Sequence, residues 1–75
     1  MAAAPQTPDS NCGRAIDTFA NLLSRDLENG MVARSVHDAA MQDLEVAAGA
    51  CRAGSQEQAL SALRATRIRH GYPAG

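Results

Sequence analysis

The chain has 75 residues, a net charge of −1 and a hydrophobic fraction of 45%. Sixteen of the hydrophobic residues are Ala, and only twelve residues are Leu, Val, Ile or Phe, so the supply of large core side chains is small. These values exclude a multidomain protein, a large substrate cavity and a membrane-spanning helix, which needs about 18 consecutive apolar residues. A domain of this length buries only about 60% of the surface of its unfolded chain, and it usually depends on a covalent bridge or a partner.

Charge is spread unevenly along the chain. All seven basic residues are Arg, which together with the Ala content indicates GC-rich microbial coding. Residues 1–51 carry a balance of −4, and residues 52–75 carry a balance of +3. Either the basic segment docks on the acidic one, or Arg64, Arg67 and Arg69 form a surface for an anionic partner, since guanidinium groups bind carboxylates and phosphates in a bidentate manner.

The first nine residues contain two Pro and no large apolar side chain beyond Met1. They predict a flexible N-terminal tail, and residues 10–75 predict a single helical domain. A charged start followed by an apolar stretch is absent, so we expect no signal peptide in these residues. The run from Ala2 to Pro5 is nevertheless typical of what remains after signal-peptide cleavage, and a native cytoplasmic start is the alternative.

The first predicted helix covers residues 12–28. Its apolar residues recur every three or four positions, which is the spacing of one helix face: they are Cys12, Ile16, Phe19, Leu23 and Leu27. Ser10 or Asn11 supplies an N-cap oxygen. Asn29 and Gly30 end the helix, because Gly takes the left-handed conformation at low cost.

The second predicted helix covers residues 33–53 and is apolar on two sides. Its main stripe consists of Val32, Val36, Ala40, Leu44, Ala47 and Cys51. A second apolar strip of mostly small residues consists of Ala39, Val46, Ala50 and Ala53. A helix with two apolar sides is typical of the middle element of a bundle.

The third predicted helix covers residues 56–70. Ser55 and Gln58 have the spacing of a capping box, in which each side chain satisfies the other residue's backbone donor. The inward face holds Ala59, Leu60 and Leu63, and the aliphatic stem of Arg67 extends it. No strand pattern or repeat is present, so the sequence predicts an all-α protein, a small three-helix bundle.

The two cysteines lie at equal distances from the break between the first two predicted helices. In an antiparallel hairpin, Cys12 and Cys51 therefore meet at the open end, and both lie on stripes that face each other. We predict a disulfide that closes the hairpin, with a contribution of up to about 4 kcal/mol to stability. Such a bond indicates an oxidising compartment, the periplasm or the extracellular space. The alternative is a pair of reduced core cysteines in a cytosolic protein.

Candidate residues for metal binding and catalysis are few. His37 and Met41 are four residues apart on the second helix and suit a soft metal such as copper, but a partly covered His beside the hairpin turn is the favoured interpretation. Asp38 follows His37, and helix neighbours point about 100° apart, so no His–carboxylate pair is expected. His70 ends the third helix, where positive charge complements exposed carbonyls. The acidic residues are expected on solvent faces.

Phosphate loops, catalytic triads and paired carboxylates are absent from the sequence, so it predicts neither an enzyme nor a bound cofactor. A pI near 6.0 and only two aromatic residues also disfavour a nucleic-acid partner. We therefore expect a small exported protein that binds another protein or a second copy of itself, as an adaptor, inhibitor, chaperone-like or assembly factor. Its expected contact surface is the second apolar strip, flanked by Met41 or by Ile68 and Tyr72. A copper or small-ligand binding protein using His37 and Met41 is the alternative.

Overall fold

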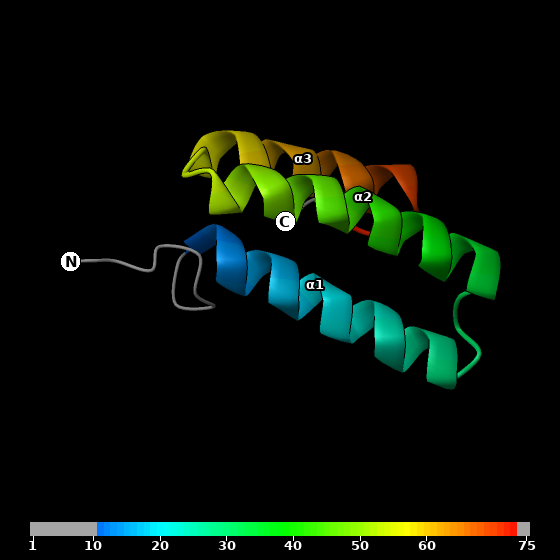
Figure 1. Ribbon diagram of the computed structural model, residues 1–75. Helices are drawn as coiled ribbons and strands as arrows, with labels where there is room; N and C mark the ends of the chain where they lie inside the picture. The colour runs from blue at the N-terminus through cyan, green and yellow to red at the C-terminus, as the bar shows by residue number, and fades with distance from the viewer. Residues whose placement is uncertain (1–10, 74–75) are drawn as a thin grey trace.

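The computed structural model describes residues 11–73, which form three helices: α1 (Asn11–Glu28), α2 (Arg34–Arg52) and α3 (Gln56–Arg69). Figure 1 shows α1 and α2 as an antiparallel hairpin, with α3 folded back along α2. Each helix contacts the other two. The predicted all-α three-helix bundle is therefore confirmed, with helix bounds that differ from the predicted ones by one residue. The predicted tail, residues 1–9, lies outside the described residues.

All three helices end in the same hydrogen-bonded motif. A glycine with positive φ follows each helix, and the N–H of the next residue returns to a carbonyl five residues earlier. These bonds are Met31 N to Asp26 O at 2.7 Å, Ser55 N to Ala50 O at 2.9 Å and Tyr72 N to Arg67 O at 2.7 Å. This Schellman arrangement satisfies carbonyls that the helix leaves unpaired. It also turns the chain sharply, so that short loops suffice to reverse its direction.

The predicted capping box at the start of α3 is wrong. Ser55 makes no side-chain cap hydrogen bond, and its N–H already donates to Ala50 at the end of α2. The backbone donor that Gln58 was expected to satisfy is therefore occupied. The neighbouring Gln56 has a different role, because its Oε1 accepts a hydrogen bond of 2.6 Å from the N–H of Cys12. A side chain of α3 thus caps the first turn of α1.

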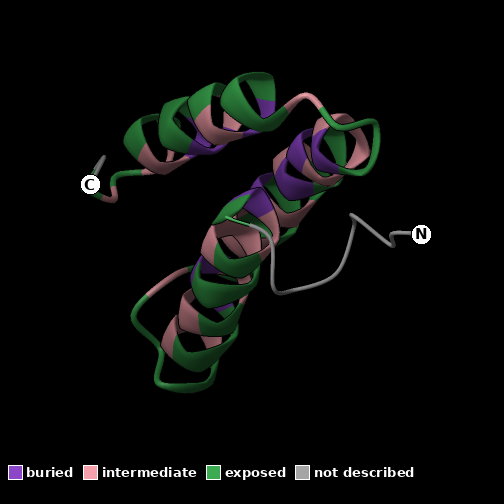
Figure 2. Ribbon diagram, turned by 90° about the vertical axis from the view of Figure 1, so that its left-hand side faces the viewer, coloured by how far each residue is buried: buried purple, intermediate pink, exposed green. Residues whose placement is uncertain are grey.

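The main core lies where the three helices face one another, and in Figure 2 the buried positions lie on these inward sides. Its buried members are Phe19, Leu23, Ala40, Leu44 and Leu63. The main stripe of α2 is confirmed, with Ala47 and Cys51 also buried and Val36 half-buried. Helix α1 contributes two of the large buried side chains, whereas α2 and α3 contribute one each, Leu44 and Leu63. The remaining buried positions of α2 are Ala40, Ala47 and Cys51, whose small side chains let its neighbours pack close to its backbone.

A second, smaller cluster closes the open end of the hairpin. Cys12 and Cys51 are joined by the predicted disulfide, with their Cα atoms 5.9 Å apart. Both are buried together with Ala59 of α3. Ile16 contacts this cluster and the main core. The bridge therefore covers one end of a continuous apolar interior and adds a covalent tie where large side chains are lacking.

The residues after α3 return to the bundle. The Tyr72 ring meets the buried Phe19 ring edge to face, with centroids 5.1 Å apart and planes at 84°. Its hydroxyl donates a 2.7 Å hydrogen bond to Oδ2 of Asp26 on α1. Arg67 covers the Phe19 ring with its Cζ 4.9 Å from the centroid, and its Nε donates to the carbonyl of Pro73. The only Phe and the only Tyr of the chain thus share one aromatic cluster.

Candidate functional site

The second apolar strip of α2 is largely open to solvent. Ala39, Val46 and Ala53 are exposed, and 70% of the Val46 surface is accessible. Ala50 departs from the others, because it is half-buried and packs against the disulfide cluster. Helix α1 and helix α3 therefore cover the main stripe of α2 but leave most of the second strip uncovered. Val46 is the one large apolar side chain on it.

The residues expected to flank this strip do not extend it. Ile68 is 60% exposed, but its sequence neighbours Arg67 and Arg69 reach Phe19 on α1 and Asp43 on α2. A residue between them, about 100° from each around the helix, points away from the bundle. Tyr72 is half-buried, and its ring packs against Phe19 on α1. Met41 also packs against the main core.

The three arginines of α3 do not gather into one cationic surface. Arg67 lies over the Phe19 ring, and Nη1 of Arg69 contacts Oδ2 of Asp43 at 2.6 Å. Arg64 is exposed and lines a surface hollow beside Glu57. Two of the three guanidinium groups thus have partners within the chain, but only Arg69 pairs with an acidic group.

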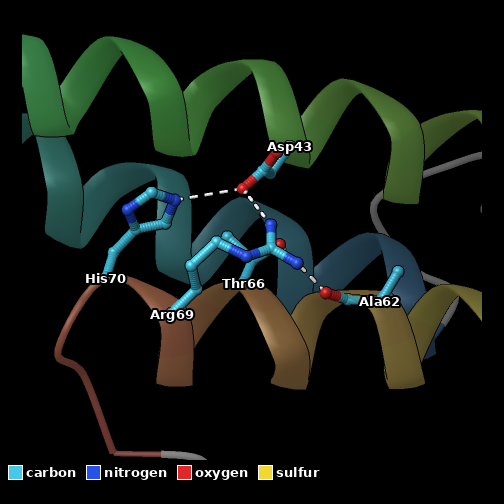
Figure 3. A network of polar contacts seen from close by, with 5 residues as sticks. All are labelled: Asp43, Ala62, Thr66, Arg69 and His70. Atoms are coloured by element: carbon cyan, nitrogen blue, oxygen red, sulfur yellow. Dashed lines mark hydrogen bonds and ion pairs between the residues drawn. The ribbon is translucent and has the colours of Figure 1, made fainter.

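Asp43 is the centre of a polar cluster between α2 and the end of α3 (Figure 3). Its Oδ2 lies 3.0 Å from Nε2 of His70 and also receives the Arg69 bond. The His70 hydrogen bond and the Arg69 charge hold the pKa of Asp43 below its usual value of 3.8, against the opposing effect of partial desolvation. Asp43 is therefore partly covered rather than on an open solvent face, and His70 pairs with it across the helix interface.

The expectation that His37 has no carboxylate partner is wrong. Nδ1 of His37 lies 2.9 Å from Oδ1 of Asp38. The Cα–Cβ bonds of neighbouring helix residues point in different directions, but the polar ends of these two side chains still come within hydrogen-bond distance. Within residues 11–73, no group of three or more His, Cys, Asp or Glu side chains is arranged to hold a metal ion. The role of His37 and Met41 as metal ligands stays a prediction.

A shallow cavity of about 210 Å³ lies between α1 and α2, close to the disulfide. Its lining residues are Gly13, Ile16, Asp17, Ala20, Ala48, Cys51 and Arg52. Ligand sites for drug-sized molecules are usually larger, at roughly 300–1,000 Å³. Small side chains on both helices produce this hollow, because Ala20 and Ala48 leave space that larger residues would fill.

The sequence analysis missed a buried polar residue of α3. Thr66 is buried, and its hydroxyl donates to the carbonyl of Ala62 one turn earlier. This bond satisfies the hydroxyl within its own helix, and the methyl group can then pack in the interior. One signal for Tyr72 was present in the sequence: the residue after the helix-ending glycine often makes an apolar contact with the last turn.

None of the described helices is both long enough and apolar enough to span a bilayer. No protein-family model matches this chain, and no curated protein or solved structure shows significant similarity to it.

Proposed function

We propose that this chain is a small, non-enzymatic protein of the periplasm or extracellular space that binds a protein partner, or a second copy of itself, through the exposed strip on α2. The observation that carries the proposal is the position of Val46, which is 70% exposed between the exposed residues Ala39 and Ala53. Apolar surface that a small domain leaves open usually marks an interface. The disulfide supports the choice of an oxidising compartment.

The geometry of α2 also suits a binding surface. Its inward side is held by α1 through the disulfide and the main core, and by α3 through the Asp43 cluster. A surface on such a supported helix loses little conformational entropy when a partner binds. The partner therefore meets a preformed helix face, and the affinity depends on the few side chains that project from it.

The test compares Val46→Glu with Ile68→Glu. Both positions are exposed large apolar residues, and both variants add one negative charge, but only Val46 lies on the strip. Complexes formed in an extract of the native compartment, and self-association of the pure protein, are measured by light scattering with size exclusion. Val46→Glu is expected to abolish complex formation, and Ile68→Glu is expected to leave it unchanged.

Circular dichroism of both variants provides the structural control, with nearly unchanged helical content expected. If Val46→Glu unfolds the protein, the strip belongs to the core and the proposal is wrong. Equal losses of binding in the two variants also contradict it, because the binding surface would then not be specific to α2.

A further inference from the structure

The solvent side of α2 has the spacing of a coiled-coil seam. Six positions alternate at intervals of four and three residues, and together they form what we name the outer face: Ser35, Ala39, Gln42, Val46, Gly49 and Ala53. None is charged, and all are exposed except Gly49, which is half-buried. An uncharged seam with this spacing is the pattern by which one helix packs along another. Within residues 11–73, no other helix covers it.

Gly49 supports a close approach by another helix. A Cβ atom at this position would meet nothing within 4 Å, so packing inside the chain gives no reason for glycine in the middle of α2. Glycine is a weak helix former, and an alanine there would suit the isolated chain better. On the outer face, however, small residues let a second backbone come near. Ala39 and Ala53 have the same effect on either side of it.

The charges beside the outer face select the partner and its direction. Asp38, Glu45 and Arg52 follow one edge of the seam at seven-residue intervals. Against an antiparallel copy of α2, this edge meets itself in reverse, so that Asp38 meets Arg52 twice and Glu45 meets Glu45 once. In a parallel pair the edge would meet the opposite one, which holds Asp43, and acid would face acid. The charges therefore complement a second, antiparallel copy.

The residues of the outer face also complement one another in this antiparallel arrangement. Centred on residue 44, the antiparallel pair sets Ser35 opposite Ala53, Ala39 opposite Gly49, and Gln42 opposite Val46. Small residues therefore face small ones toward the ends of the contact, and the valine side chains lie on either side of the symmetry axis. Glu45 and Arg52 make no ion pair within residues 11–73, and Asp38 contacts only the neighbouring His37.

We propose that a second copy of this chain covers the outer face, in a two-fold symmetric dimer whose α2 helices run antiparallel. This inference rests on the proposed function, because it names the partner of the same surface. Two Asp38–Arg52 pairs fix the direction, and the Glu45 pair on the axis opposes association. The contact is one helix wide, at the small end of protein interfaces, so we expect a dissociation constant in the micromolar range.

The test reverses the two charges one at a time and then together. Asp38→Arg and Arg52→Asp each turn two attractive pairs into repulsive ones, and each is expected to weaken the dimer about tenfold. The double variant restores opposite charges and has the net charge of the natural chain, so its dissociation constant is expected within about threefold of the natural value. Sedimentation velocity over a concentration series measures each constant.

Two further variants distinguish a weaker dimer from a partly unfolded protein. Glu28→Arg makes the same change in net charge as Asp38→Arg at an exposed position on α1, and it is expected to leave the dimer unchanged. Glu45→Gln removes the repulsion on the axis and is expected to tighten the dimer about threefold, a gain that partial unfolding does not produce.

Two outcomes overturn the inference. One is a natural chain that stays monomeric at several hundred micromolar, and the other is a double variant as weak as the single ones. If either occurs while Val46→Glu still abolishes a complex with another protein, the proposed function stands and only the second copy is excluded. If Val46→Glu affects no complex at all, the proposed function itself fails.

Discussion

Tyr72 makes three contacts, two with α1 and one with α3. Its ring packs on the buried Phe19, its hydroxyl bonds Asp26 on α1, and its backbone N–H closes the last turn of α3. Asp43 makes a comparable connection between α2 and the two residues at the end of α3. The side-chain contacts of Tyr72 and Asp43 join residues that are far apart in the sequence, and together they hold the shortest helix against the hairpin.

The ionisation of Tyr72 gives a stability change at alkaline pH. Desolvation, the Asp26 hydrogen bond and the Asp26 charge raise the pKa of Tyr72 from 10.0 to about 12. Because folding favours the neutral phenol, this contribution is fully present below pH 10.0 and is lost as the pH rises toward about 12. Urea unfolding should therefore show decreasing stability across that interval.

The single tyrosine makes this prediction direct to measure, because tyrosinate absorbance reports this one group. Folded protein should titrate near 12, and urea-unfolded protein near 10.0. Tyr72→Phe keeps the ring contact with Phe19 but removes the hydroxyl, and it should cost about 1 kcal/mol at neutral pH. The stability of that variant should no longer fall in the alkaline interval; an equal fall would assign the effect to other groups.

At the scale of the helices, the residues at the C-terminal end of each helix determine where it stops. The glycines after α1, α2 and α3 all have positive φ, and the same hydrogen-bonded turn follows in each case. Gly49 differs from them, because it lies inside α2 with ordinary helical geometry. Gly30, Gly54 and Gly71 thus lie at helix ends where the backbone requires glycine, and Gly49 lies on the outer face where it does not.

Alanine substitutions at Gly71 and Gly49 should change the free energy of unfolding in opposite directions. Neither added Cβ meets an atom within 4 Å, so a clash with packed neighbours plays no part. Gly71 has φ of 86°, and alanine there should destabilise the fold by about 1 kcal/mol. Gly49→Ala should stabilise it by about 0.5–1 kcal/mol. Urea unfolding at concentrations where the chain is monomeric measures both, and changes of equal sign would contradict the explanation.

Some features at the scale of the helices could be predicted from the sequence, and others could not. Helix bounds, the main stripe of α2 and the Cys12–Cys51 pairing follow from spacing, since they depend on periodicity and on the symmetry of a hairpin. The contact of Tyr72 with Asp26 and the contacts of Arg69 and His70 with Asp43 depend on how far α3 is shifted along its neighbours, which no local pattern determines. For the same reason, the sequence did not predict that the Tyr72 ring packs against Phe19.

For the whole molecule, the disulfide is a stabilising feature that can be removed without changing the helices themselves. It joins residues 39 apart, so it restricts a long segment of the unfolded chain. The interior beside it is made of small side chains, with Ala59 and the two cysteines as its buried members. Noncovalent packing at this end is therefore weak, and the bond compensates for it.

Replacing both cysteines with serine should lower the free energy of unfolding by about 2–4 kcal/mol. The double replacement avoids a leftover thiol, and reduction of the natural protein provides an independent route to the same state. Unreduced protein should resist alkylation and be about two mass units lighter than the reduced form. Two freely alkylated thiols in protein prepared under oxidising conditions would contradict the bond and weaken the assignment to an oxidising compartment.

The position of the bridge also divides the bundle into a closed ring and an attached arm. Peptide bonds link α1 to α2 at one end and sulfur links them at the other, so a single backbone cut in residues 29–33 leaves both helices joined. Helix α3 lies outside this ring, and Gly54 and Ser55 connect it to α2. Detachment of α3 is therefore a local opening that breaks no covalent bond of the ring. Such an opening uncovers Phe19 and Leu44 while the ring stays covalently intact.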